Sequence, residues 1–315
     1  MPELPECERA RALLHECAVG LIIERVVALE QGGGPREGLF DDRVLEGSAA
    51  AFTEALVDLR VLAAKRKGKQ LWLELGGGVP KALLIHHGMT GAVVIEGRKA
   101  MNYKTFAVDD AAWPPKFAKF ELVLRGDDGA ATNVAFVDAR RFGRVRVRGA
   151  GAAGEEISSL APDALDALPD AEAMVAKLAG KATTIKAVLL DQNFLVSGIG
   201  NWVADECLYH AGIDPASAAN ALDAAHVAAL RAAIGDVCAR ATSANADSEE
   251  FPDTWLFHHR WANQKTGSIS SPIGRIHFAT VGGRTTAFVP DKQKLFRTKR
   301  SSDALAPTKK KTRKH

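Results

Sequence analysis

The sequence contains only four cysteines among its 315 residues, and no two of them are spaced as Cys-x-x-Cys. This absence excludes a zinc finger built from cysteine pairs, and we predict a protein with no metal and no other cofactor. No apolar run approaches the ~18 residues of a membrane span, so we expect no membrane partner. The acidic start of the chain, with Glu3, Glu6 and Glu8, is unlike a secretory signal or a transit peptide. We therefore expect reduced thiols in an intracellular protein.

A strong excess of charge of one sign is also missing from most of the chain. The formal net charge is +3, but residues 291–315 carry +8, which leaves −5 for residues 1–290. An average of this kind is weak support for a nucleic-acid partner. Local clusters of Lys and Arg must carry any argument for such a partner.

Hydrophobic patterning predicts an α+β fold. A helix over 3–19 carries an apolar stripe, and short alternating segments separated by Gly and Asp turns then indicate an antiparallel β-sandwich. The predicted strands are 70–75, 82–86, 91–96, 119–125, 132–138 and 143–149. After a predicted linker at 150–154, Ala-rich segments indicate helices at 170–179, 183–191, 200–211 and 218–242. Gly282-Gly283 predicts a β-hairpin between 275–281 and 285–289.

These patterns divide the chain into four parts. We predict a β-sandwich domain over 1–150, a helical domain over 151–250, a finger-like hairpin over 251–291 and a basic, disordered tail over 292–315.

The first candidate for chemistry is the N-terminus itself. Met1 before Pro2 is normally removed, which leaves a secondary amine whose pKa is about 7.7–8.0 and is lowered further by the positive end of the helix. Such an amine attacks a sugar C1′ or an aldehyde to give a cationic iminium, and Glu3 beside it suits general acid–base work. The alternative is structural, because Pro followed by Glu is also a common way to open a helix.

Five further segments suit contact with nucleic acid. The basic turn 65–69 and the arginines of 138–143 suit phosphate contact, and Met89 suits an apolar wedge. The Gly-Ile-Gly turn before Asn201 exposes N–H groups at a helix N-terminus, with Asn201 expected at the cap, and Arg284 lies at the predicted hairpin tip. Each segment taken singly is explained at least as well by a structural role, such as a solvated turn, a core methionine or a plain helix connection.

Taken together and in this order, the segments resemble the formamidopyrimidine-DNA glycosylase/endonuclease VIII family. The resemblance spans residues 2 to about 291 and is carried by MPELPE at 1–6, RKGKQL at 66–71, HHGMTG at 86–91, DARRFG at 138–143, LLDQNFLVSGIGNWVADECL at 189–208 and GGRTTAFVP at 282–290. Leu4 after Pro-Glu favours the formamidopyrimidine enzymes over endonuclease VIII. Because 252–290 lacks cysteine, the hairpin is similar to the zinc-free finger of the plant and fungal branch. We expect packing of Trp255, Trp261, Phe278 and Phe288 to hold it.

The resemblance implies a role for each matched residue. Pro2 would be the Schiff-base nucleophile, Glu3 the acid and base that helps to open the sugar, and Lys69 a catalytic lysine near the lesion phosphate. Met89, Arg140 and Phe142 would fill the space left by an extruded nucleotide. Asn201 and Arg284 would clamp phosphates beside the lesion, and His86, Arg141 and Lys186 would make further backbone contacts.

The activity that the resemblance implies is base excision repair by a bifunctional DNA glycosylase and abasic-site lyase. The enzyme would act as a monomer, through a helix–two-turn–helix element, on double-stranded DNA that contains oxidised bases or abasic sites, with β,δ-elimination. Fapy purines and hydantoins are the expected substrates, and 8-oxoguanine is a further candidate, because 243–253 matches no motif that would indicate a preference for it.

Two alternatives stay open at this point. One is an endonuclease VIII-like enzyme for oxidised pyrimidines, and the other is a non-catalytic DNA-binding protein of the same fold. The basic run 309–315 indicates either nonspecific attraction to DNA or a nuclear address, and we expect a nuclear location.

Overall fold

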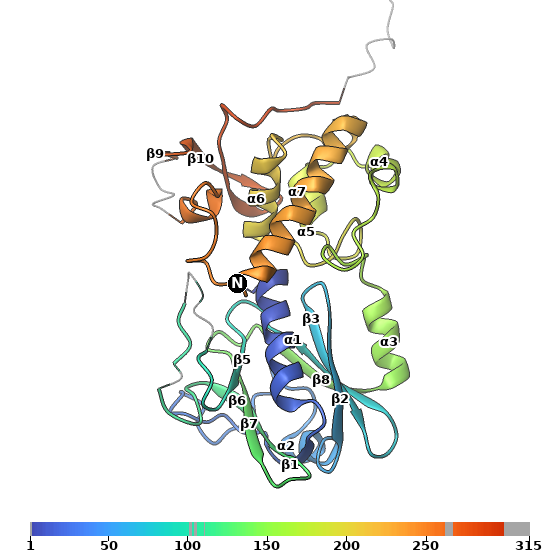
Figure 1. The fold of residues 1–315 in the computed structure, drawn as a ribbon, viewed down its shortest axis with the longest axis vertical. Helices are drawn as coiled ribbons and strands as arrows, with labels where there is room; N and C mark the ends of the chain where they lie inside the picture. The colour runs from blue at the N-terminus through green and yellow to red at the C-terminus, as the bar shows by residue number, and fades with distance from the viewer. Residues whose placement is uncertain (1, 101–102, 104–105, 110, 262–266, 299–315) are drawn as a thin grey trace, which may run out of the picture.

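The computed structural model describes residues 2–298 except 101–102, 104–105, 110 and 262–266, so Met1 and the basic run 309–315 fall outside the described residues. Helix α1 (Leu4–Ala18) opens the fold, close to the predicted range. Pro5 lies in its first turn, where the missing N–H costs nothing, and the Glu3 N–H donates to Oε2 of Glu6 at 2.9 Å. Figure 1 shows the N-terminus at the junction between the sheet and the C-terminal helices.

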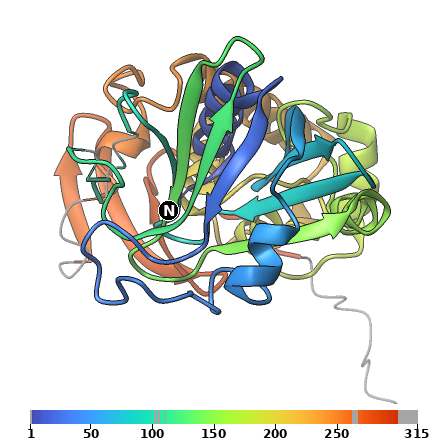
Figure 2. The same ribbon diagram turned by 90° about the horizontal axis from the view of Figure 1, so that it is seen from below.

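The N-terminal domain is one antiparallel sheet with the strand order β5-β7-β6-β1-β2-β3-β4-β8. Its two halves lie at an angle to one another (Figure 2) and enclose a core that includes Ile23, Leu73, Phe120 and Val145. This is the predicted sandwich. The strands are β1 (Ile22–Val27), β2 (Arg60–Lys67), β3 (Gln70–Gly76), β4 (Lys81–His86), β5 (Ala92–Ile95), β6 (Ala118–Arg125), β7 (Ala131–Val137) and β8 (Arg144–Gly149), with helix α2 (Ala49–Glu54) between β1 and β2.

Residues 150–154 form a helix, so the predicted linker is wrong. Helix α3 (Ala150–Ser158) follows β8 directly and packs its buried Ala153 on the β-sheet, against Leu84 and Trp72. The alanines of this segment favour helix more than its two glycines oppose it, once one face can be buried.

The helical domain is built from α4 (Ala171–Ala179), α5 (Ile185–Leu190), α6 (Asn201–His210) and α7 (Ala224–Ser243), with a single 3₁₀ turn, η1 (Ala219–Ala221), before α7. Leu4 of α1 is buried in the core of this domain, so the chain's first turn belongs to both domains. Helix α7 begins later than predicted because the Asp223 side chain accepts the His226 N–H at 2.9 Å and caps the helix there.

The finger is a three-stranded sheet of β9 (Ser268–Ser271), β10 (Gly274–Val281) and β11 (Arg284–Phe288), preceded by the short turn η2 (Leu256–His258). Only part of the expected aromatic packing holds it. Phe278 packs against an apolar cluster of Leu256, Ile273, Ile276, Ala287 and Val289, whereas Trp255 and Trp261 pack with the helical core.

The start of the predicted disordered tail is ordered. The Lys294 N–H donates to the Gly212 carbonyl at 2.9 Å, Gln293 is buried, and Phe296 packs against the helical core. Over the described residues, no helix is long and apolar enough to cross a membrane.

Candidate active site and DNA-binding surface

The carboxylate of Glu3 caps helix α6, almost two hundred residues further along the chain. It accepts the N–H of Trp202 at 2.9 Å and the N–H of Val203 at 3.0 Å, and the residue is only 1% exposed. Two of the N–H groups that a helix leaves unpaired at its start are thereby satisfied. A Cβ on Gly200 would lie 2.3 Å from Cδ of Glu3, so the glycine is what lets the first turn of the chain approach this helix.

A second carboxyl group, that of Glu6, lies beside the first. Its Oε2 accepts the Glu3 N–H at 2.9 Å, and its Oε1 accepts the indole N–H of Trp202 at 3.1 Å. Burial, followed by repulsion from the charge of Glu3, raises the pKa of Glu6 to about 7. The two carboxyl groups therefore differ in their surroundings, because that of Glu3 is held by the N-terminus of α6 and that of Glu6 has a pKa near neutral pH.

Glu6 should give the protein a pH-dependent stability. Its pKa is raised from 4.5 to about 7 on folding, so its contribution is fully present below about pH 4.5 and is lost as the pH rises through about 7. We expect the free energy of unfolding of wild type, relative to Glu6→Gln, to fall across this window, as measured by urea denaturation at several pH values. Glu16→Gln, an exposed carboxyl on the same helix, is the control. A flat difference for Glu6→Gln would contradict the raised pKa.

Lys69 lies at the tip of the β2–β3 hairpin, whose register pairs Lys67 with Gln70. Burial lowers the pKa of its ammonium, and the charge of Glu3 acts in the opposite direction. Gly68 adopts φ +58°, and a Cβ there would lie 2.8 Å from Cβ of Ser197, so the hairpin tip touches the Gly-Ile-Gly turn before α6. This contact brings Lys69 close to the N-terminus of α6, which holds Glu3.

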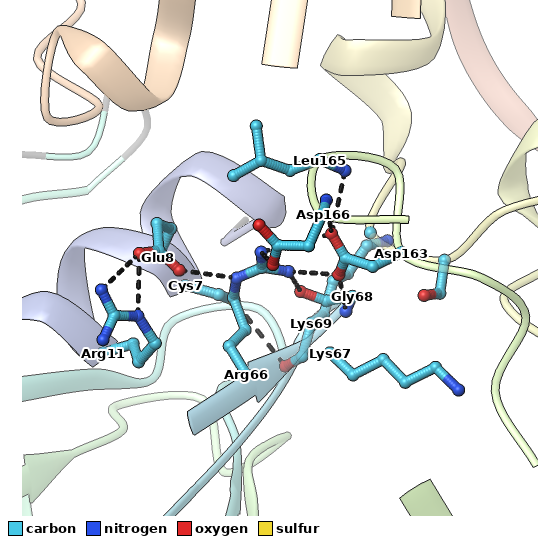
Figure 3. Close-up of polar contacts among 12 residues, drawn as sticks. Cys7, Glu8, Arg11, Arg66, Lys67, Gly68, Lys69, Asp163, Leu165 and Asp166 are labelled. Atoms are coloured by element: carbon cyan, nitrogen blue, oxygen red, sulfur yellow. Dashed lines mark hydrogen bonds and ion pairs between the residues drawn. The ribbon is translucent and has the colours of Figure 1, made fainter. Parts of the chain in front are cut away.

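The buried guanidinium of Arg66 fastens this hairpin to the helical domain (Figure 3). It donates to Oε2 of Glu8 at 2.9 Å, Oδ2 of Asp163 at 2.5 Å and Oδ2 of Asp166 at 2.9 Å. Asp163 Oδ2 also accepts the Gly68 N–H at 2.5 Å, next to Lys69. Arg66 and Asp163 therefore set the position of Lys69 relative to helix α1.

Removing this guanidinium should be costly. We expect Arg66→Ala to lower the free energy of unfolding by about 3–5 kcal/mol, because it leaves the carboxylate of Asp163 buried without its partner. Urea denaturation measures the loss. Arg125→Ala breaks an exposed pair with Glu24 and should cost far less. Equal losses in the two variants would show that the Arg66 network is not a structural connection between the domains.

Two loops beside the site carry the residues predicted to fill the gap in the DNA. The Arg140 guanidinium lies 5.1 Å from the centre of the Phe142 ring, and Phe142 is 46% exposed. Asp138 fixes this loop by accepting the Thr90 hydroxyl at 2.6 Å and the Gly143 N–H at 2.6 Å. An exposed apolar ring held beside a cation on a rigid turn has the form of a wedge for a base stack.

Arg284, Asn201 and His86 were expected to contact DNA phosphates, and the structure gives each of them different surroundings. Arg284 is exposed at the start of β11, and Asn201 donates from Nδ2 to the Thr285 carbonyl at 2.9 Å, which ties α6 to the hairpin tip. Asn201 is the first helical residue and Gly200 is the N-cap, so the expected cap at Asn201 is wrong. Burial lowers the pKa of His86 to about 4, so its imidazole is neutral at pH 7.

Lys186, which was expected to contact the DNA backbone, lies inside the protein. Its side chain is fully buried, and Nζ donates to Oδ1 of Asp205 at 2.5 Å and to Oγ1 of Thr286 at 2.6 Å. The ammonium is paired with Asp205 inside the protein, and its contacts join α5, α6 and β11. Arg141 is also engaged, with Nε and Nη2 both donating to Asp41, although a quarter of its side chain stays exposed.

A cavity of about 340 Å³ collects five of the eleven predicted site residues. Glu3, Met89, Arg140, Asn201 and Arg284 all line it. This volume lies within the range of small-molecule binding sites. Pro2 is buried next to Glu3 at the start of α1.

Residues that the sequence analysis did not assign to the site complete the walls of this cavity. They are Thr90, Phe106, Trp202, Arg260 and Trp261. Thr90 lies in the motif at 86–91 and Trp202 in the motif at 189–208, next to Asn201, so the sequence could have indicated both residues. Phe106, Arg260 and Trp261 lie outside the motifs at 86–91 and 189–208, and Trp261 was expected from the sequence to pack in the finger.

Comparison with known proteins identifies the family. Residues 1–145 match the formamidopyrimidine-DNA glycosylase N-terminal domain, and residues 160–253 match the formamidopyrimidine-DNA glycosylase H2TH domain. The chain belongs to the formamidopyrimidine-DNA glycosylase family. It is 40% identical over 298 residues to the formamidopyrimidine-DNA glycosylase of Arabidopsis thaliana, a match that covers 94% of this chain and 72% of that protein. The enzyme of Paracoccus denitrificans is 36% identical, with 85% of each chain covered.

Solved structures of this family share the fold. A complex between the Lactococcus lactis Fpg and DNA containing an abasic site gives a TM-score of 0.70 at 24% identity, and covers 93% of this chain and 99% of that one. The same bacterial protein bound to DNA containing N7-benzyl-Fapy-dG gives 0.71 at 24% identity, over 93% and 100% of the chains. Among the described residues of this member of the formamidopyrimidine-DNA glycosylase family, no group of three or more His, Cys, Asp or Glu side chains is placed to hold a metal ion.

Proposed function

We propose that this DNA glycosylase of the formamidopyrimidine family excises oxidised purines from double-stranded DNA through a Schiff base on Pro2. The secondary amine forms a bond to C1′ of the damaged nucleotide. The glycosidic bond breaks, and its electron pair leaves with the base, which takes up a proton. The newly attached nitrogen gives up its proton to the Glu3 carboxylate, and Glu3 passes a proton to the sugar ring oxygen as the ring opens, which leaves a cationic iminium at C1′.

Strand cleavage follows from the same intermediate. The iminium acidifies the C2′–H bond, a base removes that proton, and the 3′ phosphate leaves in a β-elimination. A second elimination releases the 5′ phosphate. The amine is regenerated by hydrolysis, so that the protein is both a glycosylase and an abasic-site lyase.

One observation carries this proposal. The carboxylate of Glu3 is fixed by two N–H groups of α6 at a cavity that is shared by both domains, with Pro2 immediately before it. A structural capping residue would need neither the adjoining cavity nor the cations of Lys69 and Arg284 nearby. The pKa of an α-amine, about 7.7–8.0, leaves part of the Pro2 population neutral and nucleophilic at pH 7.

The substrate range that we propose is Fapy purines, hydantoins and 8-oxoguanine. The similarity of this chain to the formamidopyrimidine-DNA glycosylase of Arabidopsis thaliana, at 40% identity over 298 residues, supports the formamidopyrimidine class.

Borohydride trapping on a panel of duplexes tests the proposal. Each duplex carries one lesion: Fapy-guanine, a hydantoin, 8-oxoguanine, an oxidised pyrimidine or an abasic site, with an undamaged duplex as the control. We expect covalent trapping with the abasic and oxidised-purine duplexes. Trapping confined to oxidised pyrimidines would assign the protein to the endonuclease VIII-like alternative, and DNA binding without trapping would assign it to the non-catalytic one.

We also propose a nuclear location on the basis of the basic run 309–315. A fluorescent fusion of the full chain should concentrate in nuclei, and replacement of the lysines and arginines of this run by Gln should disperse it.

A further inference from the structure

The cavity beside Glu3 has one wall that the proposed chemistry does not use. Trp261 and Arg260 line it, in the segment between η2 and the finger. If Pro2 attacks C1′ of a nucleotide turned out of the helix, the attached base must be housed close to Glu3. The cavity is in that place and its volume is suited to a single base.

The indole ring of Trp261 is held from two sides. The Arg260 guanidinium lies 4.5 Å from the ring centre, and the Phe257 ring contacts it edge-on at 5.4 Å between centroids. Nε1 of Trp261 is buried with no hydrogen-bond partner among the described residues. A tryptophan used only for packing normally pairs this N–H when it is buried, so the ring's position is set by something other than its own hydrogen bonding.

Arg260 connects this ring to the catalytic carboxylate. Its guanidinium donates to Oδ2 of Asp205 at 2.7 Å, and Asp205 also pairs with Lys186 and accepts the Ala287 N–H at 3.0 Å. Asp205 lies on α6, the helix whose N-terminus holds Glu3. The same rigid helix therefore fixes both the acid–base group and the aromatic wall.

We propose that Trp261, supported by Arg260, is the surface on which the extruded damaged base stacks during excision. This proposal rests on the proposed function and adds to it the side chain that contacts the extruded base. Asp205 pairs with Arg260 as well as with Lys186, so these three groups keep a net charge of +1, and the indole of Trp261 supplies the flat π surface of the wall. Stacking on such a surface favours planar bases of any sequence context. Among the proposed substrates, a flat lesion such as 8-oxoguanine gains more from this stacking than a spirocyclic hydantoin, whose two rings are perpendicular to one another.

Single-turnover kinetics on two kinds of duplex test this inference. One duplex carries 8-oxoguanine and reports base excision, and the other carries a preformed abasic site, which has no base to stack, and reports strand cleavage. For Trp261→Ala we expect the ratio of the excision rate to the abasic cleavage rate to fall by about tenfold to a hundredfold, the size typical of losing one base–aromatic stack. Trp261→Phe keeps an aromatic face and should restore most of the ratio. With a spirocyclic hydantoin, the fall for Trp261→Ala should be clearly smaller.

Trp72→Ala is the matched control. Trp72 is half-buried on β3, where it packs against α3 in the N-terminal domain, and its loss should leave the ratio unchanged. An unchanged ratio in Trp261→Ala would overturn the proposal. A parallel loss of both activities would overturn it equally, since Trp261 would then act through folding or DNA binding. These outcomes differ from failure of the proposed function, in which wild type itself would give no trapping on the abasic duplex.

Discussion

Attaching one extra residue ahead of Pro2 should abolish Schiff-base formation. The added peptide bond converts the secondary amine into an amide, whose nitrogen lone pair is delocalised and no longer nucleophilic. We expect strand cleavage at an abasic site to fall by at least about 10³-fold, as is usual when the nucleophile of a covalent mechanism is removed. Borohydride trapping should disappear, while the affinity for the abasic duplex, measured by fluorescence anisotropy, should change only a few-fold.

The control is the same extended chain after proteolytic removal of the added residue. It should regain trapping and cleavage, which separates a chemical effect at the amine from damage to the packing of Leu4 and α1. If the extended chain still trapped DNA at the wild-type rate, the attacking nitrogen would belong to a lysine, and Lys69 would be the first candidate.

Glu3→Gln should uncouple base excision from abasic-site chemistry. The amide cannot donate or accept the proton that sugar-ring opening requires, and loss of general acid–base catalysis costs about 10²–10⁴-fold. Its remaining carbonyl oxygen still accepts one of the two N–H groups of α6, so the helix stays capped in part. We expect excision of Fapy-guanine to fall by this amount, with a smaller effect on trapping at a preformed abasic site.

Glu24→Gln is the control for this substitution. It makes the same chemical change on an exposed side chain of β1, which pairs with Arg125 and does not line the cavity. Its excision rate should equal that of wild type. Equal and large losses of excision and of trapping in Glu3→Gln would indicate that the carboxylate holds α6 in place and has no proton-transfer role.

Local pattern in the sequence was sufficient for much of the fold. The spacing of apolar residues predicted α1 and most strands of the sandwich, and the two adjacent glycines at 282–283 predicted the turn of the finger hairpin. Strands β1 and β2 were not predicted, because their burial alternates irregularly along the segment. The helix at 150–158 was missed because its glycines indicate a linker until a sheet surface is available to cover Ala153.

The site could be predicted only where its residues lie in short, recognisable sequence motifs. Pro2 with Glu3, and the Gly-Ile-Gly turn before Asn201, are recognisable as segments, but their contact joins residues nearly two hundred positions apart. No local pattern indicates that Lys186 pairs with Asp205 inside the protein. For the same reason, Trp261 emerged as part of the cavity only when the two domains were placed together.

The most direct test of the account is to locate the DNA-linked atom. The enzyme is trapped on an abasic duplex with borohydride, digested with nuclease and protease, and the adduct is assigned by tandem mass spectrometry. The account predicts a deoxyribose remnant on the nitrogen of Pro2, in a chain whose initiator methionine has been removed. A remnant on any lysine, or active protein that still carries Met1 or an acetyl group ahead of Pro2, would contradict it.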